Sequence, residues 1–209
     1  MALRIAVLLS GSGTTLENLL EHRANGLLDA DVAAVLSSKP NAYGLERARR
    51  HGIPAHPLDR RAFADETSFQ DALHAILDSV QPDLVVLAGF LSRFELRGRY
   101  EGRTLNIHPA LIPAFCGKGF YGARVHRAVL EYGVKLSGAT VHFCDEEYDT
   151  GPIVVQKAVP VLDDDTPETL AERVHEAECE IYPQAIQLFA ESRLRIEGRR
   201  VRVLPPQAG

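Results

Sequence analysis

The sequence has 209 residues, 45% hydrophobic and 24% charged, which is the usual balance of one compact globular domain. A net charge of −5 argues against nucleic-acid binding, because such binding generally needs a basic surface. No apolar run approaches the roughly 20 residues that a membrane-spanning helix requires.

Strands and helices alternate in the first half of the predicted structure. Residues 4–9 are apolar after Arg4 and meet a glycine-rich turn, so we interpret them as a buried strand and not as a signal peptide. Further strands are predicted at residues 32–36, 55–58 and 84–89. Helices are predicted after the turn, with Thr14 or Thr15 as N-cap, at residues 43–51 and at residues 69–80. This alternation indicates right-handed βαβ units on a parallel sheet.

The second half has a different pattern. Residues 139–143 and 153–161 are predicted strands, separated by an acidic loop. Thr166 and Pro167 have the residue types of an N-cap and a first helical turn, so a long helix is predicted after them. Pro183 should kink that helix. Its expected buried face consists of Leu170, Val174, Ala177, Ile181 and Leu188, and a hairpin is expected over residues 194–203.

These elements predict an α/β fold, with a Rossmann-like, mostly parallel twisted sheet flanked by helices and an antiparallel addition in the C-terminal half. We expect a single domain over residues 1–209 with two functional halves, about 1–105 and about 106–209.

The cysteines and the basic clusters carry little functional signal. Cys116, Cys144 and Cys179 are odd in number and lack a CxxC pair, which favours neither a disulfide framework nor a zinc site. Two arginine clusters are interpreted as solvated faces: Arg47, Arg49 and Arg50, and Arg199, Arg200 and Arg202.

The turn at residues 10–15, Ser-Gly-Ser-Gly-Thr-Thr, follows a strand and opens a helix. Glycines let the backbone approach an anion, and free amides with the helix dipole favour negative charge there. The spacing fits neither GxGxxG nor the phosphate loop of nucleotide hydrolases. The turn therefore indicates either a site for a single phosphate or a tight turn that needs glycine for geometry alone.

Asn106 and His108 precede Pro109 in an otherwise apolar segment. In a strand the two side chains would lie on one face, where an amide and an imidazole could stabilise an oxyanion. The alternative is a buried histidine with a backbone partner.

Five strings carry a family resemblance: SGSGTTL, LNIHPALIPAF, GATVHF, EEYDTGPI and ERVHEAECEIYP. They occur in order over nearly the whole chain, and Asn-x-His-Pro combined with Asp-x-Gly is highly specific. The sequence resembles the glycinamide ribonucleotide formyltransferases of the folate-dependent formyltransferase superfamily. The resemblance implies transfer of the formyl group of 10-formyltetrahydrofolate to the substrate amine in purine biosynthesis, without a metal. It makes the N-terminal half nucleotide-binding and the C-terminal half catalytic and folate-binding.

The same resemblance implies roles for individual residues. Asn106 and protonated His108 would stabilise the oxyanion of the tetrahedral adduct. Asp149 would hold His108 and accept the proton of the amine through a water, and His142 would help to fix the aspartate loop.

Binding residues are also implied, together with the turn. Glu178 would bind the ribose hydroxyls and His175 would lie near the phosphate, although an ordinary surface pair is the alternative for these two. The expected ribonucleotide-binding set is Gly11, Ser12, Gly13, Thr14, Thr15, His175 and Glu178. The expected folate-binding set is Phe90, Leu91, Ser92, Arg93, Asp145, Glu146, Glu147 and Tyr148.

Three positions depart from the family pattern. Thr15 stands where many relatives have asparagine, and Ser92 intervenes before Arg93, which leaves the phosphate and folate contacts open in detail. The segment 115–122 is about five residues longer than in the shortest relatives. Its glycines suit either a mobile cover or a tolerated surface insertion.

Other functions are weighed against this one. A formyltetrahydrofolate hydrolase and a non-catalytic folate- or nucleotide-binding module remain alternatives. The acidic chain ends at Gly209 and its first strand begins at residue 4, so we expect neither a tRNA-binding domain nor a preceding regulatory domain. The expected partners are the two small-molecule substrates, with no nucleic acid and no membrane, in the cytoplasm. Monomer and homodimer are both open.

Overall fold

The computed structural model describes residues 2–206, and its chain divides into two compact units, Met1–Leu105 and Asn106–Gly209. The expectation of a single domain with two functional halves stays a prediction. Within the described residues, no helix combines the length and apolarity needed to cross a membrane.

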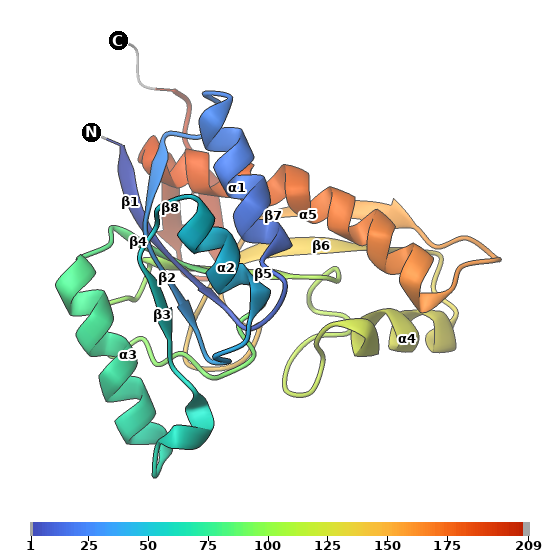
Figure 1. The fold of residues 1–209 in the computed structure, drawn as a ribbon. Helices are drawn as coiled ribbons and strands as arrows, with labels where there is room; N and C mark the ends of the chain where they lie inside the picture. The colour runs from blue at the N-terminus through green and yellow to red at the C-terminus, as the bar shows by residue number, and fades with distance from the viewer. Residues whose placement is uncertain (1, 207–209) are drawn as a thin grey trace. The chain divides into compact units, whose positions relative to one another are not determined.

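The first unit alternates strands and helices, as the sequence predicts (Figure 1). Its strands follow the order β3-β2-β1-β4, and each neighbouring pair is parallel. In chain order the elements are β1 (Leu3–Leu9), α1 (Thr14–Ala24), β2 (Ala30–Ser37), α2 (Tyr43–Arg50), β3 (Ala55–Pro57), the 3-10 turn η1 (Arg60–Ala62), α3 (Glu66–Val80) and β4 (Leu84–Leu87). The strand β5 (Thr104–His108) crosses from the first unit into the second.

The apolar runs explain these elements. From Ile5 to Leu9, β1 has no exposed residue, as expected of a strand covered on both faces. In α3, Phe69, Leu73 and Leu77 are fully buried at helical spacing, whereas the flanking apolar positions of the helix are half-buried. The helix begins with a capping box at Asp65, a start that was not predicted from the sequence.

The start of α1 differs from the prediction. Neither threonine caps the helix: the N-cap is Gly13, in the left-handed conformation with φ of 75° and without a side-chain cap. A Cβ atom on Gly13 would lie 2.5 Å from the Cα atom of Gly44 on α2. The close approach of α2 therefore requires glycine at this position. Thr14 and Thr15, the two predicted caps, both lie inside the helix.

The second unit carries the antiparallel strands. Its strand order is β5-β6-β7-β9-β8, with β6 antiparallel to β7, β7 parallel to β9, and β9 antiparallel to β8. After β5 the elements are α4 (Ala123–Tyr132), β6 (Leu136–Phe143), β7 (Ile153–Pro160), α5 (Pro167–Ala190), β8 (Leu194–Glu197) and β9 (Arg200–Val203). Helix α5 packs on β6, β7 and α4. The expected α/β class, mostly parallel with antiparallel strands in the C-terminal half, is confirmed.

Helix α5 begins as predicted. Thr166 forms a capping box with Thr169, and Pro167 occupies the first turn. Four of the five residues expected on its buried face are buried, and Leu188 is half-buried. The helix continues through the buried Pro183, and the kink expected there stays a prediction.

Candidate active site

Asn106 and His108 lie on β5 and face the same neighbour. The Nδ2 atom of Asn106 is 3.3 Å from one carboxylate oxygen of Asp149, and Nδ1 of His108 is 3.5 Å from the other. The intervening Ile107 is buried. The two-residue period of the strand thus puts amide, imidazole and carboxylate side by side.

Both ring nitrogens of His108 face oxygen atoms that can only accept hydrogen bonds. Nε2 lies 2.9 Å from the backbone oxygen of Phe115, while Nδ1 faces the carboxylate of Asp149. Only 5% of the side chain is exposed. Because a carbonyl and a carboxylate are both acceptors, the doubly protonated imidazolium is the form of the ring that satisfies both contacts.

The Asn106 amide and the His142 ring are oriented together. The Nδ1 atom of His142 is 2.9 Å from the backbone oxygen of Phe143 and so carries a proton. In the neutral ring, Nε2 is then an acceptor, and the Nδ2 group of Asn106 donates to it over 3.1 Å. The second N–H of the same amide points to Asp149. His142 thereby fixes which way the Asn106 amide faces.

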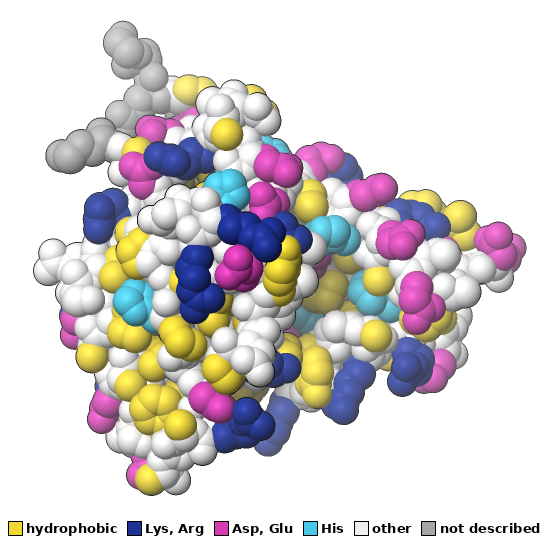
Figure 2. All heavy atoms as spheres, in the orientation of Figure 1, with side chains coloured by type: hydrophobic (Ala, Val, Ile, Leu, Met, Phe, Trp, Pro, Cys, Tyr) yellow, Lys and Arg dark blue, Asp and Glu magenta, His cyan; other side chains and the backbone are white. Residues whose placement is uncertain are grey.

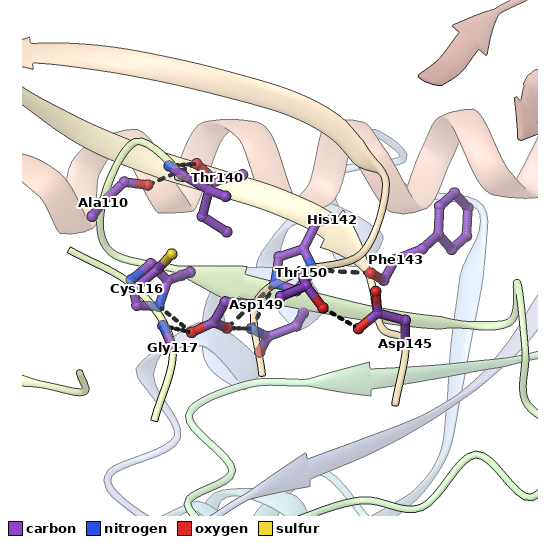
Figure 3. A network of polar contacts seen from close by, with 12 residues as sticks. Ala110, Cys116, Gly117, Thr140, His142, Phe143, Asp145, Asp149 and Thr150 are labelled. Carbon is purple, nitrogen blue, oxygen red and sulfur yellow. Dashed lines mark hydrogen bonds and ion pairs between the residues drawn. The ribbon is translucent and has the colours of Figure 1, made fainter. Parts of the chain in front are cut away.

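Asp149 is the centre of this network, and Figure 3 shows its carboxylate between Gly117 and His142. Burial favours the neutral acid, but the His142 ring in its protonated form, the charge on His108 and the amide of Gly117 together outweigh it. The pKa of Asp149 is therefore held below its usual value. The amide of Gly117 donates to Oδ2 over 2.9 Å. The site thus places an ionised carboxylate beside the His108 imidazole and the Asn106 amide.

A buried threonine supports the segment that follows His108. The hydroxyl of Thr140 on β6 donates to the backbone oxygen of Ala110 over 2.7 Å (Figure 3) and accepts from the backbone amide of Ile112. Gln156 on β7 donates both to this hydroxyl and to the backbone oxygen of Ile112. These bonds tie the segment after β5 to two neighbouring strands.

The acidic loop between β6 and β7 is closed by its own polar groups. Asp145 accepts from the hydroxyl of Thr150 over 2.6 Å and from the backbone amide of Glu147 over 3.2 Å. Asp149 has a positive φ of 60°, a conformation that aspartate tolerates better than most residues. Tyr148 beside it is about half exposed. Of the loop residues expected to bind folate, only Asp145 is half-buried; Glu146, Glu147 and Tyr148 are exposed.

Gly151 allows the loop to close. A Cβ atom there would lie 1.8 Å from the backbone oxygen of Phe143. We expect Gly151→Ala to lower the free energy of unfolding by about 3 kcal/mol or more, the upper end of overpacking costs, because backbone must move. The melting temperature should then fall by roughly 6–12 °C. Thermal unfolding checks this, with Gly11→Ala as the control because no atom lies within 4 Å of its added methyl group. Equal melting temperatures for the two variants would contradict the steric argument.

The glycine-rich turn and the segment after β4 belong to the first unit. Gly11, Ser12 and Thr14 are exposed and Thr15 is half-buried. Buried Ser10 accepts a hydrogen bond from the backbone amide of Leu91 over 2.9 Å, which ties the two segments together. Leu91 and Arg93 are exposed, and Phe90 and Ser92 are half-buried.

A second polar cluster of the second unit lies on α5. The Nδ1 atom of His175 is 3.2 Å from a carboxylate oxygen of Glu178, and this hydrogen bond raises the pKa of His175. His126 on α4 is within electrostatic reach of both Glu178 and His108. Its pKa is lowered by burial, and its Nδ1 atom is buried without a hydrogen-bond partner.

Two groups that contact the site through their backbone were not predicted from the sequence. The carbonyl of Phe115 and the amide of Gly117 lie in a segment that was interpreted only as a cover or an insertion. A contact made by a backbone group does not depend on the type of side chain, so the sequence does not reveal it. The spacing of the glycines was the only sequence feature that drew attention to this segment. Within residues 2–206, no group of three or more histidine, cysteine or acidic side chains is arranged to hold a metal ion. None of the three cysteines forms a disulfide.

Comparisons with known proteins agree on one family. Residues 3–186 match the family model described as formyl transferase. The chain is 38% identical to the phosphoribosylglycinamide formyltransferase of Escherichia coli, over 98% of this chain and 97% of that protein. It is 41% identical to the trifunctional purine biosynthetic protein adenosine-3 of Gallus gallus, but it spans only 19% of that longer protein. Among solved structures, glycinamide ribonucleotide transformylase 1 from Symbiobacterium toebii superposes with a TM-score of 0.91 at 48% identity, covering 98% of this chain and 95% of that one.

Proposed function

The chain belongs to the phosphoribosylglycinamide formyltransferases of the formyl transferase family, and we propose from this that it formylates the amine of glycinamide ribonucleotide. The formyl donor is 10-formyltetrahydrofolate, and the reaction is a step of purine biosynthesis. The observation that carries the proposal is the His108 ring, held between the carboxylate of Asp149 and a carbonyl oxygen with the Asn106 amide beside it.

In the proposed reaction the uncharged amine attacks the formyl carbon. The carbonyl oxygen gains negative charge as the tetrahedral adduct forms, and the bond from carbon to N10 of the folate then breaks. N10 ends with one proton, the amine loses one, and the products are the formamide and tetrahydrofolate. Because the charge on oxygen appears only along this path, donors aimed at it lower the barrier.

Two side chains supply these donors. The Nε2–H group of His108 donates to the carbonyl oxygen of Phe115 over 2.9 Å, so that oxygen stands where the proposal puts the formyl oxygen relative to the ring. Asn106 donates to Asp149 over 3.3 Å, the longer of its two hydrogen bonds. We assign to the formyl oxygen the role of replacing these two acceptors.

Asp149 has two proposed roles. Its carboxylate stabilises the cationic form of His108, and through a water it accepts the proton that the attacking amine loses. The lowered pKa of Asp149 supports both roles, because an ionised carboxylate is needed in each. His142 keeps Asn106 aimed, through the hydrogen bond from Nδ2 to Nε2.

The substrates are assigned to the remaining polar groups. The turn Gly11–Thr15 takes the phosphate of the ribonucleotide on its amides, with Glu178 on the ribose hydroxyls and His175 near the phosphate. The folate is assigned to Phe90–Arg93 and to the loop Asp145–Tyr148. The exposure of Leu91, Arg93 and Tyr148 supports their availability to a ligand. We expect the enzyme to act in the cytoplasm.

The fate of the formyl group tests the proposal. Donor folate carrying a ¹³C-labelled formyl carbon is incubated with enzyme and glycinamide ribonucleotide, and the products are followed by NMR. We expect the label in the formamide of the ribonucleotide, in equal amount to the tetrahydrofolate formed. Label appearing as formate would identify a hydrolase and reject the transfer. No change in the donor would reject both activities.

Glu178 is expected to contribute mainly to ribonucleotide binding. Glu178→Ala should weaken that binding by roughly 10–100-fold, as expected for the loss of hydrogen bonds to a charged group. Calorimetric titration with the ribonucleotide measures this, with exposed Glu176→Ala on the same helix as the control. If the affinity of the Glu178 variant equals that of the control, the ribose assignment is wrong.

A further inference from the structure

We propose that Arg47 on α2 is a positioning residue that aims the backbone amide of Gly13 at the phosphate of the ribonucleotide. The inference rests on the proposed function, which places the phosphate at the glycine-rich turn. Arg47 does not need to touch the ligand. It contacts the turn on the side of α2, where it bonds the carbonyl oxygen of Ser12.

The contact geometry is specific. The Nε atom of Arg47 donates to the backbone oxygen of Ser12 over 3.0 Å, and Nη1 donates to a carboxylate oxygen of Glu17 over 2.6 Å. The two side chains are only 25% and 29% exposed. The Cδ atom of Arg47 would be 3.4 Å from a Cβ atom on Gly13, so its aliphatic stem lies against the turn as well.

The hydrogen bond from Arg47 to the Ser12 carbonyl also sets the direction of the Gly13 amide, because both groups belong to one planar peptide. In a trans peptide the carbonyl of one residue and the N–H of the next point in opposite directions. Holding the Ser12 carbonyl toward α2 therefore points the Gly13 amide away from α2. The backbone amide of Gly44 does the same for the preceding plane, because it donates to the carbonyl oxygen of Gly11 over 3.1 Å and so directs the Ser12 amide outward.

Helix α1 extends the same array of donors. The carbonyl of Gly13 accepts from the backbone amide of Glu17 over 3.0 Å, as in the first turn of a helix. The amide of Thr14 in that peptide plane therefore also points out from the helix start. Successive amides that converge on one point form an anion site, and the helix dipole adds to it. Gly13 has no capping side chain to occupy them.

The positive charge of Arg47 does not by itself account for a role in phosphate binding. Its hydrogen bond to Glu17 lowers the pKa of that carboxyl group, so the pair is an ionised one with little net charge to offer a phosphate. His51 also contacts Glu17, with 3.2 Å between Nε2 and Oε1. Figure 2 shows basic and acidic side chains adjoining one another over α1 and α2. The rigid guanidinium can bond both the carbonyl and the carboxylate, which a lysine could not do in the same geometry.

The test compares Arg47→Met with Arg49→Met, a change on the same helix at an arginine whose side chain is 53% exposed. Methionine keeps the aliphatic stem and removes the guanidinium. For Arg47→Met, we expect the KM for glycinamide ribonucleotide to rise about 10–100-fold, with kcat at saturation within about threefold of wild type. The KM for the folate should stay within about twofold, and Arg49→Met should match wild type in every parameter. Equal KM values for the two variants, or a fall in kcat alone, would overturn the proposal.

A second comparison separates positioning from charge. If Arg47 only neutralised Glu17, then Glu17→Gln would restore ribonucleotide affinity in the Arg47→Met background, and this result would overturn the proposal. We expect the double variant to remain as weak as Arg47→Met. Binding of inorganic phosphate, followed by ³¹P NMR, gives a readout independent of catalysis. Phosphate binding that depends on Arg47 in an enzyme inactive toward the ribonucleotide would reject the proposed function and keep the anion site.

Discussion

His108→Ala is expected to lower kcat for formyl transfer by about 10²–10⁴-fold, the usual range for loss of a positioned acid. The ring lies with Nδ1 toward Asp149 and Nε2 toward a carbonyl oxygen, so alanine removes the donor proposed for the oxyanion. Steady-state kinetics with saturating ribonucleotide and folate measure the effect. His22→Ala on α1 serves as the control for a histidine outside the site.

Ribonucleotide affinity distinguishes a lost catalytic group from a damaged fold. The groups proposed to bind the ribonucleotide, which are the turn Gly11–Thr15 and Glu178, do not include His108, so titration should give nearly the same dissociation constant for wild type and His108→Ala. A parallel loss of affinity and turnover would contradict this division between binding and chemistry.

Asp149→Asn is expected to have an effect of similar size, about 10²–10⁴-fold on kcat, although the two side chains have nearly the same shape. The amide cannot stabilise a cationic His108 or accept a proton from the amine. It also brings a donor toward the amide of Gly117, which now donates to Oδ2 over 2.9 Å. Kinetics of Asp149→Asn beside Asp164→Asn, an exposed aspartate, give the comparison.

The double variant tests whether the two groups act as a unit. If Asp149 acts largely through His108, then His108→Ala combined with Asp149→Asn should be little worse than His108→Ala alone. Losses that multiply would contradict the coupling.

The pH dependence of stability follows from the lowered pKa of Asp149. Because the pKa is lower in the folded state than in the unfolded chain, ionised Asp149 stabilises the fold above the unfolded pKa. This stabilisation is lost as pH falls through the folded-state pKa. The difference in unfolding free energy between wild type and Asp149→Asn should therefore shrink in acid. A constant difference across that range would show that the carboxylate charge is not stabilised.

Patterns of neighbouring residues were sufficient to predict several strands and helices. The apolar run of β1, the helical spacing of α3 and the Thr166-Pro167 start of α5 each predict the element found. The period of β5 likewise predicts that Asn106 and His108 share a face. The partner on the acidic loop came from the family resemblance, because no local rule pairs positions about 40 residues apart.

Helix α4 was not predicted, for identifiable reasons. Its N-cap is Gly122, without a capping side chain, and it follows a glycine-rich segment. Of its ten residues only Val125, His126 and Val129 are buried, and a histidine does not count toward an apolar stripe. The one clear sign was Gly133 just past its end, in the left-handed conformation.

Arg47 shows why tertiary contacts elude a single sequence. Its cluster was interpreted as solvated, and this holds for Arg49 and Arg50, whose side chains are more than half exposed. It is wrong for Arg47, which turns toward Ser12 and Glu17 some 30 residues earlier in the chain. The approach of α2 to the turn decides the difference, and it also places Gly44 against Gly13.

The dependence of turnover on an acceptor amine tests the central claim most directly. Purified enzyme in metal-free buffer is given 10-formyltetrahydrofolate, with and without glycinamide ribonucleotide, and the appearance of tetrahydrofolate is followed. We predict turnover only when the ribonucleotide is present. Formation of tetrahydrofolate and formate at the same rate in its absence would contradict the account.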